Sequence, residues 1–174
     1  TIRAIEDITF DVMSNELCAL LGPSGCGKST LLRIIAGLED PTGGAVFLEG
    51  QEILTAGRDR GMVFQGFTSF PWLTVRQNVE YGMRLNKVPR SIRAERAAHY
   101  IDLVHLTKFK DAYPKQLSGG MKQRVAIART LANDPEVLLM DEPFGALDAE
   151  TRWHMQELMV EILESSKKTV IMVT

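Results

Sequence analysis

Apolar residues are distributed along this chain in two alternating patterns. Short apolar runs bounded by polar or turn-forming residues are typical of buried strands. Such runs occur at 16–21, 45–50, 60–65, 136–140 and 168–173. Elsewhere apolar residues recur every three or four positions, which predicts helices. These helical segments include 28–36, 119–132 and 149–165. Apolar strands that alternate with helices indicate an α/β fold with a mainly parallel sheet flanked by helices on both faces.

Two further parts interrupt this alternation. The opening stretch 2–12 alternates apolar and polar residues and is rich in β-branched residues, so we expect an N-terminal antiparallel β part there, as a strand or hairpin. From Val75 to Leu106 the spacing is helical and is divided at Pro89, which predicts an inserted helical subdomain over about 75–118. The chain would then be a single domain, 1–174, with a core formed by 1–74 and 119–174.

Composition narrows the possible functions. A net charge of −2 and an isoelectric point near 5.9 give no basic surface for a polyanion, so we do not expect nucleic acid as a partner. Cys18 and Cys26 are too few for a disulfide framework, which favours a reducing compartment. No apolar run reaches the roughly 18 residues needed to span a bilayer, and no signal peptide opens the sequence, so a soluble chain is expected.

The segment "GPSGCGKS", residues 22–29, matches the pattern G-x-x-x-x-G-K-[ST] and lies between a predicted strand and a predicted helix. In such a P-loop the glycines let backbone N–H groups surround phosphate oxygens, Lys28 reaches the β- and γ-phosphates, and the Ser29 hydroxyl ligates Mg²⁺. A glycine-rich turn without a ligand is the alternative, and the strand–loop–helix context argues against it. The predicted nucleotide-binding residues here are Gly22, Pro23, Ser24, Gly25, Cys26, Gly27, Lys28, Ser29 and Thr30.

Two carboxylates end the apolar run at 136–140. Their position is the carboxyl edge of the predicted sheet, where open α/β sheets bind ligands. Adjacent strand residues point to opposite faces, so Asp141 and Glu142 would have different roles. We expect Asp141 to hold Mg²⁺, usually through water, and Glu142 to orient or deprotonate an attacking water. The alternative is an ordinary solvated strand end, and the P-loop upstream argues against it.

A second anion cradle lies in "LSGGM", where Ser118, Gly119 and Gly120 stand at the start of a predicted helix. Within one P-loop domain the phosphates are already surrounded, so this second cradle has nothing to hold in the same molecule. Two copies placed head to tail would solve this. Each ATP would then lie between the P-loop of one copy and residues 118–120 of the other.

The motifs "GPSGCGKST", "GMVFQ", "LSGGMKQR", "LLMDEP" and "GALD", in this order, resemble the nucleotide-binding subunit of ABC transporters over essentially the whole chain. The resemblance implies a P-loop NTPase fold, ATP and Mg²⁺ as cofactors, ATPase activity and a homodimer that sandwiches ATP. Residues 118–120 would contact the γ-phosphate of the ATP on the opposite subunit. Gln65 would lie near Mg²⁺ and the attacking water and take part in both metal binding and catalysis. Asp148 would face the partner subunit.

The aromatic stretch 66–74, "GFTSFPWLT", follows Gln65, where polar residues are usual. Phe67, Phe70 and Trp72 form either a local aromatic core under the helical subdomain or a docking groove for a helix of a partner chain, and both can hold together. The resemblance implies that this region meets a cytoplasmic helix of a membrane-spanning permease subunit, with a substrate-binding protein as an indirect partner. The subunit would then be peripheral on the cytoplasmic face of the cell membrane.

The stretch 66–74 and Met121, where the family usually has Gln, most resemble importers of nitrate, sulfonate, taurine or bicarbonate. We therefore expect an ATPase subunit that energises uptake of a small anion. The alternative is a non-transport ABC ATPase that acts on nucleic acid or the ribosome. The resemblance also leads us to expect a fragment, since the adenine-stacking aromatic residue would precede Thr1 and the switch histidine would follow Thr174.

Overall fold

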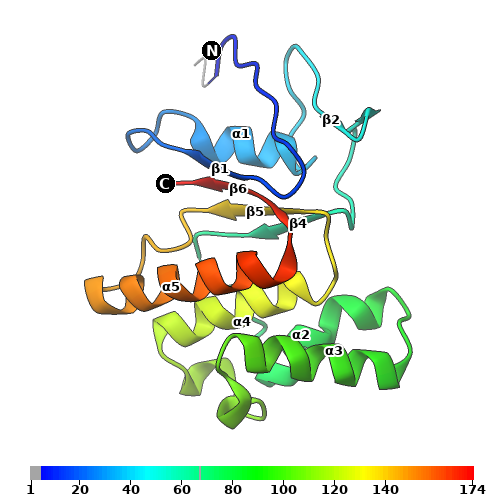
Figure 1. The fold of residues 1–174 in the computed structure, drawn as a ribbon, viewed down its shortest axis with the longest axis vertical. Helices are drawn as coiled ribbons and strands as arrows, with labels where there is room; N and C mark the ends of the chain where they lie inside the picture. The colour runs from blue at the N-terminus through cyan, green and yellow to red at the C-terminus, as the bar shows by residue number, and fades with distance from the viewer. Residues whose placement is uncertain (1–4, 67) are drawn as a thin grey trace.

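The computed structural model describes residues 5–66 and 68–174 and is built around a four-stranded sheet. The strands are β1 (Leu17–Leu20), β4 (Arg60–Val63), β5 (Val137–Asp141) and β6 (Thr169–Val173). Their order across the sheet is β1-β6-β5-β4, and every neighbouring pair is parallel (Figure 1). The parallel sheet expected from the apolar runs is therefore confirmed.

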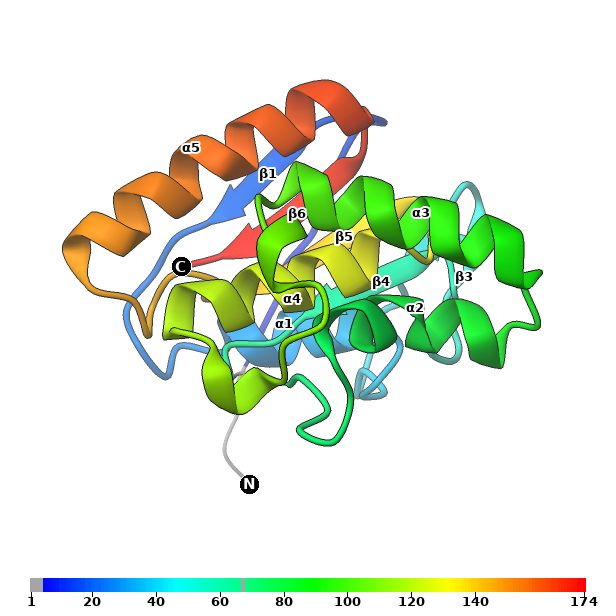
Figure 2. The same cartoon turned by 90° about the horizontal axis from the view of Figure 1, so that it is seen from below.

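Helices cover both faces of this sheet. They are α1 (Lys28–Ile35), α2 (Val75–Leu85), α3 (Arg90–Leu103), α4 (Gly119–Leu131) and α5 (Ala149–Ser166), with short 3₁₀ turns η1 (Thr107–Phe109) and η2 (Pro114–Gln116). Figures 1 and 2 show α1 on one side of the sheet and α4 and α5 on the other. Helices α2 and α3 pack against α4 and each other. This confirms the α/β fold with helices on both faces, while the division into a core and a helical subdomain stays a prediction.

The central strand β5 shows how the sequence builds two cores. Val137 and Leu139 pack in the cluster that contains Leu32 of α1. Leu138 and Met140 alternate with them and pack on the other face, in the cluster formed with α4 and α5. All five residues of the strand are buried, which requires an apolar run rather than a half-polar alternation. The same period of two places the last residue of β5 on the face of the sheet that α1 covers.

The antiparallel part of the predicted fold is a two-stranded sheet of β2 (Phe47–Leu48) and β3 (Gln51–Glu52). The strand expected over 45–50 thus shrinks to two residues, and β3 was not predicted. The strand or hairpin expected over 2–12 is wrong for the described residues, because 5–13 contain no strand, and residues 1–4 lie outside the described part. Alternation does not make a strand unless a neighbouring strand satisfies its backbone groups, and most of this segment is exposed. Among the described residues, no helix combines the length and apolar character that a bilayer crossing requires.

Candidate functional site

The loop between β1 and α1 leaves backbone donors free at a helix start. Gly25 and Gly27 have φ angles of 81° and 100°, which are open to glycine but costly for other residues. Gly27 is the N-cap of α1, and no side chain accepts a hydrogen bond from the first turn. Residues 22–26 are exposed and 27–30 half-buried. Free N–H groups at the positive end of a helix form a cradle for an anion.

Lys28 brings a positive charge over this cradle. Its Nζ donates to the carbonyl oxygens of Gly22, at 2.6 Å, and Pro23, at 2.9 Å. Both acceptors are neutral, so these two bonds position the ammonium group without neutralising its charge. The P-loop therefore presents backbone N–H groups and a cation to the same anion.

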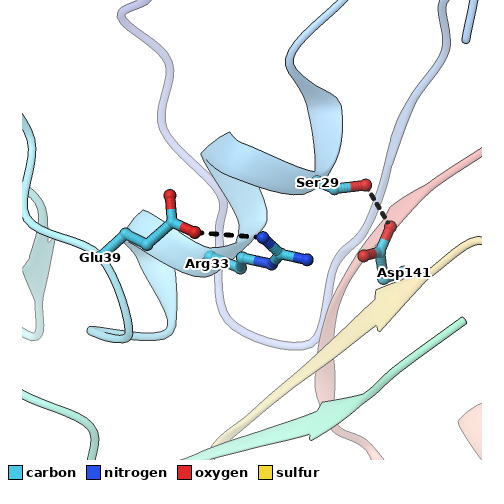
Figure 3. A network of polar contacts seen from close by, with 4 residues as sticks. All are labelled: Ser29, Arg33, Glu39 and Asp141. Atoms are coloured by element: carbon cyan, nitrogen blue, oxygen red, sulfur yellow. Dashed lines mark hydrogen bonds and ion pairs between the residues drawn. The ribbon is translucent and has the colours of Figure 1, made fainter. Parts of the chain in front are cut away.

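Ser29 and Asp141 meet from two different elements (Figure 3). Ser29 lies in the first turn of α1, and its hydroxyl donates to Asp141 Oδ1 at 2.8 Å. Asp141 ends β5 on the face of the sheet that α1 covers and is 4% exposed. A hydroxyl and a carboxylate in contact, beside a phosphate cradle, are the hard oxygen donors that Mg²⁺ prefers. The chemistry of this pair therefore fits the predicted cation. Figure 3 also shows the ion pair of Arg33 with Glu39, 3.1 Å apart at the exposed end of α1.

Glu142 directly follows the last residue of β5 and has a different hydrogen-bond partner from Asp141. Its φ of 41° is in the left-handed region, which is uncommon for a residue with a side chain and is frequent at functional sites. The Glu142 N–H donates to Val173 O of β6 at 3.0 Å, which fixes this turn on the neighbouring strand. Glu142 Oε2 accepts a hydrogen bond of 2.8 Å from Nε2 of Gln65. The segment after β4 thus reaches the half-buried carboxylate at the end of β5.

The second cradle, residues 118–120, lies at the start of α4, and Asp148 lies at the start of α5. Ser118 is the N-cap of α4, and its hydroxyl accepts from the Met121 N–H at 3.3 Å. Asp148 is the N-cap of α5 and accepts from the backbone N–H and the hydroxyl of Thr151, at 2.9 and 2.6 Å. These hydrogen bonds, led by the one from the hydroxyl, lower the pKa of the Asp148 carboxyl. Among the described residues, neither Ser118 nor Asp148 has a hydrogen bond to the P-loop.

The buried side-chain amide of Asn78 forms hydrogen bonds to the backbone of the segment 66–74. Asn78 of α2 is fully buried, accepts from the Phe70 N–H and donates to the carbonyl oxygens of Phe70, Leu73 and Thr74. The Phe70 ring lies 4.4 Å from that of Tyr81, so part of this segment forms the expected aromatic core. Trp72 is 69% exposed, while Phe67 lies outside the described residues.

An open groove of about 500 Å³ adjoins this segment. Phe70, Tyr81 and Leu85 contribute apolar surface to it, and Thr68 and Arg129 of α4 also line it. Arg129 donates to the Thr68 carbonyl and hydroxyl oxygens, at 2.7 and 2.6 Å, and its guanidinium lies 5.3 Å from the centre of the Phe70 ring. The helix that begins at Gly119 is thereby tied to the segment that follows Gln65.

Three residues important to this geometry were missed at the sequence level: Asn78, Arg129 and Thr151. Asn78 carried a signal, because a polar residue occurs beside Val75, Val79 and Met83 on the buried stripe of α2. The other two form contacts across separate elements and have no local pattern that marks them. His99, His105 and His154 are exposed.

A family model described as "ABC transporter" matches residues 5–145. The chain belongs to the ABC transporter family. Among curated relatives, an uncharacterized ABC transporter ATP-binding protein of Methanocaldococcus jannaschii is 56% identical over 99% of this chain. The nitrate import ATP-binding protein NrtD of Synechocystis is 49% identical over the whole chain, and so is the taurine import ATP-binding protein TauB of Pelagibacter ubique.

This ABC chain spans 65% of the length of the first two of those relatives and 66% of the third. Among solved structures, a dimeric ATP-binding cassette in a post-hydrolysis state, bound to ADP and Pi, superposes with a TM-score of 0.85. It is 36% identical, and the match covers 98% of this chain and 79% of that one. The P-loop NTPase fold expected from the motifs is therefore confirmed.

Proposed function

We propose that this protein is the ATP-binding and ATP-hydrolysing subunit of an importer that takes up a small anion. The observation that carries the proposal is the convergence of the P-loop, Asp141 and Glu142 at the carboxyl edge of the sheet. Loops from β1, β4 and β5 each supply one part of a phosphate and cation site there. The relatives named for nitrate import and taurine import support the importer branch and a small substrate that bears an anionic group, since nitrate is an anion and taurine carries a sulfonate.

In this proposal the P-loop binds the triphosphate of ATP. The N–H groups of residues 22–30 surround the phosphates, and Lys28 exchanges its loop carbonyls for phosphate oxygens, which are stronger partners because they are charged. Ser29, Asp141 and Gln65 would hold Mg²⁺, which would offset negative charge on the phosphates.

Glu142 is placed to act on water. Its carboxylate accepts from Gln65, so one oxygen is oriented by the amide and the other can accept a proton from a water molecule on the phosphate side. Gln65 also precedes the segment 66–74, so a displacement of that segment moves the amide relative to the carboxylate. Hydrolysis would thereby respond to whatever binds the segment.

Residues 118–120 and Asp148 serve a second copy of the protein. Their helix starts expose donors and a carboxylate that have no nucleotide partner in the same chain. The dimeric ATP-binding cassette among the structural neighbours supports this arrangement. Two copies related head to tail would each supply residues 118–120 to the γ-phosphate held by the other P-loop.

The segment 66–74 and the adjoining groove receive a helix of a membrane-spanning permease subunit. Exposed Trp72 and the apolar wall of the groove offer surface for a partner. Arg129 links this surface to α4 and hence to residues 118–120, which gives a physical route from the permease to the second cradle. The protein would be peripheral on the cytoplasmic face of the membrane, with a substrate-binding protein as an indirect partner.

Substitution of Glu142 by Gln in the full-length protein tests the proposed ATPase. The amide keeps the shape and can still accept from Gln65, but it cannot take a proton, so we expect turnover to fall by roughly 10²- to 10⁴-fold. ATP binding should remain, and the protein should accumulate as an ATP-bound dimer by light scattering. Glu157→Gln, at an exposed position on α5, is the matched control and should behave as the parent. Normal hydrolysis by Glu142→Gln would overturn the role assigned to this carboxylate.

A further inference from the structure

The starts of α4 and α5 are joined by one side chain, that of Thr151. Gly120 is buried, and a Cβ atom added to it would lie 2.5 Å from Cγ2 of Thr151. The methyl group of Thr151 therefore occupies the space beside Gly120, and this close approach requires a residue without a side chain there. Ser118, Gly120 and Thr151 also line one shared pocket of about 270 Å³.

The polar half of the same side chain holds Asp148. Its hydroxyl donates to Oδ2 at 2.6 Å, while the Thr151 N–H donates to Oδ1 at 2.9 Å. Both oxygens of this exposed carboxylate are thus bonded to one residue. A hydroxyl alone would satisfy Asp148, and a methyl alone would fill the space beside Gly120. Threonine supplies both groups from a single Cβ atom.

We propose that Thr151 is a positioning residue that fixes Asp148 relative to residues 118–120. Asp148 and residues 118–120 then form one ordered surface that contacts a second copy. The inference rests on the proposed ATP-sandwiched dimer and adds to it a residue that touches neither nucleotide nor the reacting atoms. A preformed surface loses less freedom on association than one that must order itself, so Thr151 acts on dimer formation and not on ATP binding by a single copy.

Two substitutions separate the halves of the side chain. Thr151→Val keeps the branched shape against Gly120 and removes the hydroxyl, whereas Thr151→Ser keeps the hydroxyl and removes the methyl group. Both are made in the full-length Glu142→Gln protein, in which ATP-dependent association can be measured without turnover. Thr107→Val is the matched control, because the Thr107 hydroxyl donates to the exposed Asp102 at 2.7 Å, a similar bond in the helical region.

With Mg²⁺ and ATP, we expect Thr151→Val to weaken association roughly tenfold, because a charge-assisted hydrogen bond is lost. Thr151→Ser should lose only about threefold, and Thr107→Val should associate as the parent does. A fluorescent ATP analogue should bind single copies of all variants within about twofold of the parent. In a pH titration followed by NMR, Thr151→Val should raise the pKa of Asp148, and Thr151→Ser should not.

Three results would overturn the inference. The first is association of Thr151→Val within twofold of the parent, and the second is the same loss of association in both Thr151 variants. The third is a loss of single-copy ATP affinity as large as the loss of association. The last would mean general damage to the fold. If the Glu142→Gln parent itself failed to associate with ATP, the proposed dimer would be wrong and this inference would fall with it. The parent measurement thus distinguishes the two failures.

Discussion

The P-loop and the start of α4 are both helix N-termini with glycines, yet the structure surrounds them differently. Beside the P-loop, Ser29 of α1 is bonded to Asp141 at the end of β5, and the next residue, Glu142, is bonded to Gln65 in the segment that follows β4. At the start of α4, the N-cap Ser118 bonds only to its own helix among the described contacts. In the proposed function the first site provides groups for phosphates, a cation and a water molecule, whereas the second provides backbone donors and the Asp148 carboxylate.

This difference teaches what each region can do by itself. No side chain caps α1, so its first N–H groups are free for a ligand. The first turn of α4 already has one N–H satisfied by the Ser118 hydroxyl, and among the described residues Ser118 has no hydrogen bond outside its own helix. We infer that the P-loop half binds ATP alone, and that the half formed by residues 118–120 and Asp148 acts only on a nucleotide held by another copy.

The largest expected effect comes from Gly119→Asp, which alters the second half alone. An acidic residue in the first turn of a helix stabilises it by a few tenths of a kcal/mol, so α4 should fold normally. The same charge would face the phosphates of the other copy, and like charges in an interface cost several kcal/mol. We expect ATP-dependent association, measured by analytical ultracentrifugation, to weaken by more than about 100-fold.

Binding of ATP to single copies should be unchanged in Gly119→Asp. Ser91→Asp adds the same charge in the first turn of α3 and is the matched control, expected to associate normally. A loss of ATP affinity in single copies of Gly119→Asp would contradict the separation of the two halves, since residues 118–120 would then belong to the same site as the P-loop.

Lys28→Ala should weaken ATP binding by single copies, which Gly119→Asp should leave unchanged. Hydrogen bonds to charged groups contribute about 1.5–3 kcal/mol, so we expect the affinity of single copies for ATP to fall roughly 30-fold. The thermal midpoint should stay within about 2 °C of the parent, because the carbonyl partners of Lys28 are in an exposed loop that water can reach. Titration with a fluorescent ATP analogue measures the first effect and calorimetry the second. Lys108→Ala, at an exposed position in η1, is the control.

Trp72→Ala has the smallest expected effect. Trp72 belongs to neither the P-loop half nor the half formed by residues 118–120 and Asp148. An exposed aromatic anchor in an interface contributes about 1–2 kcal/mol, so binding to the purified permease subunits should weaken roughly tenfold. ATP binding and ATP-dependent association should stay as in the parent. Trp153→Ala on α5 removes a similarly exposed indole, 62% against 69%, and should leave permease binding intact. Equal losses in both variants would contradict the docking surface assigned to 66–74.

Much of the fold could be predicted because its elements have strong local patterns. The fully buried strand β5 has an uninterrupted apolar run, and the period of two along it places Asp141 on the side where Ser29 lies. The P-loop combines residue spacing with a strand and a helix on either side. These features depend on near neighbours in sequence, so a single sequence contains them.

Other features depend on distant neighbours and could not be predicted. The opening stretch alternates like a strand, but none of its described residues belongs to a strand. The left-handed turn at Glu142 is fixed by a hydrogen bond from its N–H to Val173, more than thirty positions away. The approach of Thr151 to Gly120 likewise joins two helices that are separated by a strand in the sequence. Such contacts have no local period or spacing that would reveal them.

Mixing two defective variants tests the central claim that each ATP is held by one copy and enclosed by another. Lys28→Ala and Gly119→Asp are each placed in the full-length Glu142→Gln protein and labelled with a donor and an acceptor fluorophore. We predict little ATP-dependent energy transfer within either variant alone and clear transfer in the mixture. A mixed pair restores one complete site from the P-loop of one copy and residues 118–120 of the other. A mixture that shows no more transfer than the separate variants would contradict the account.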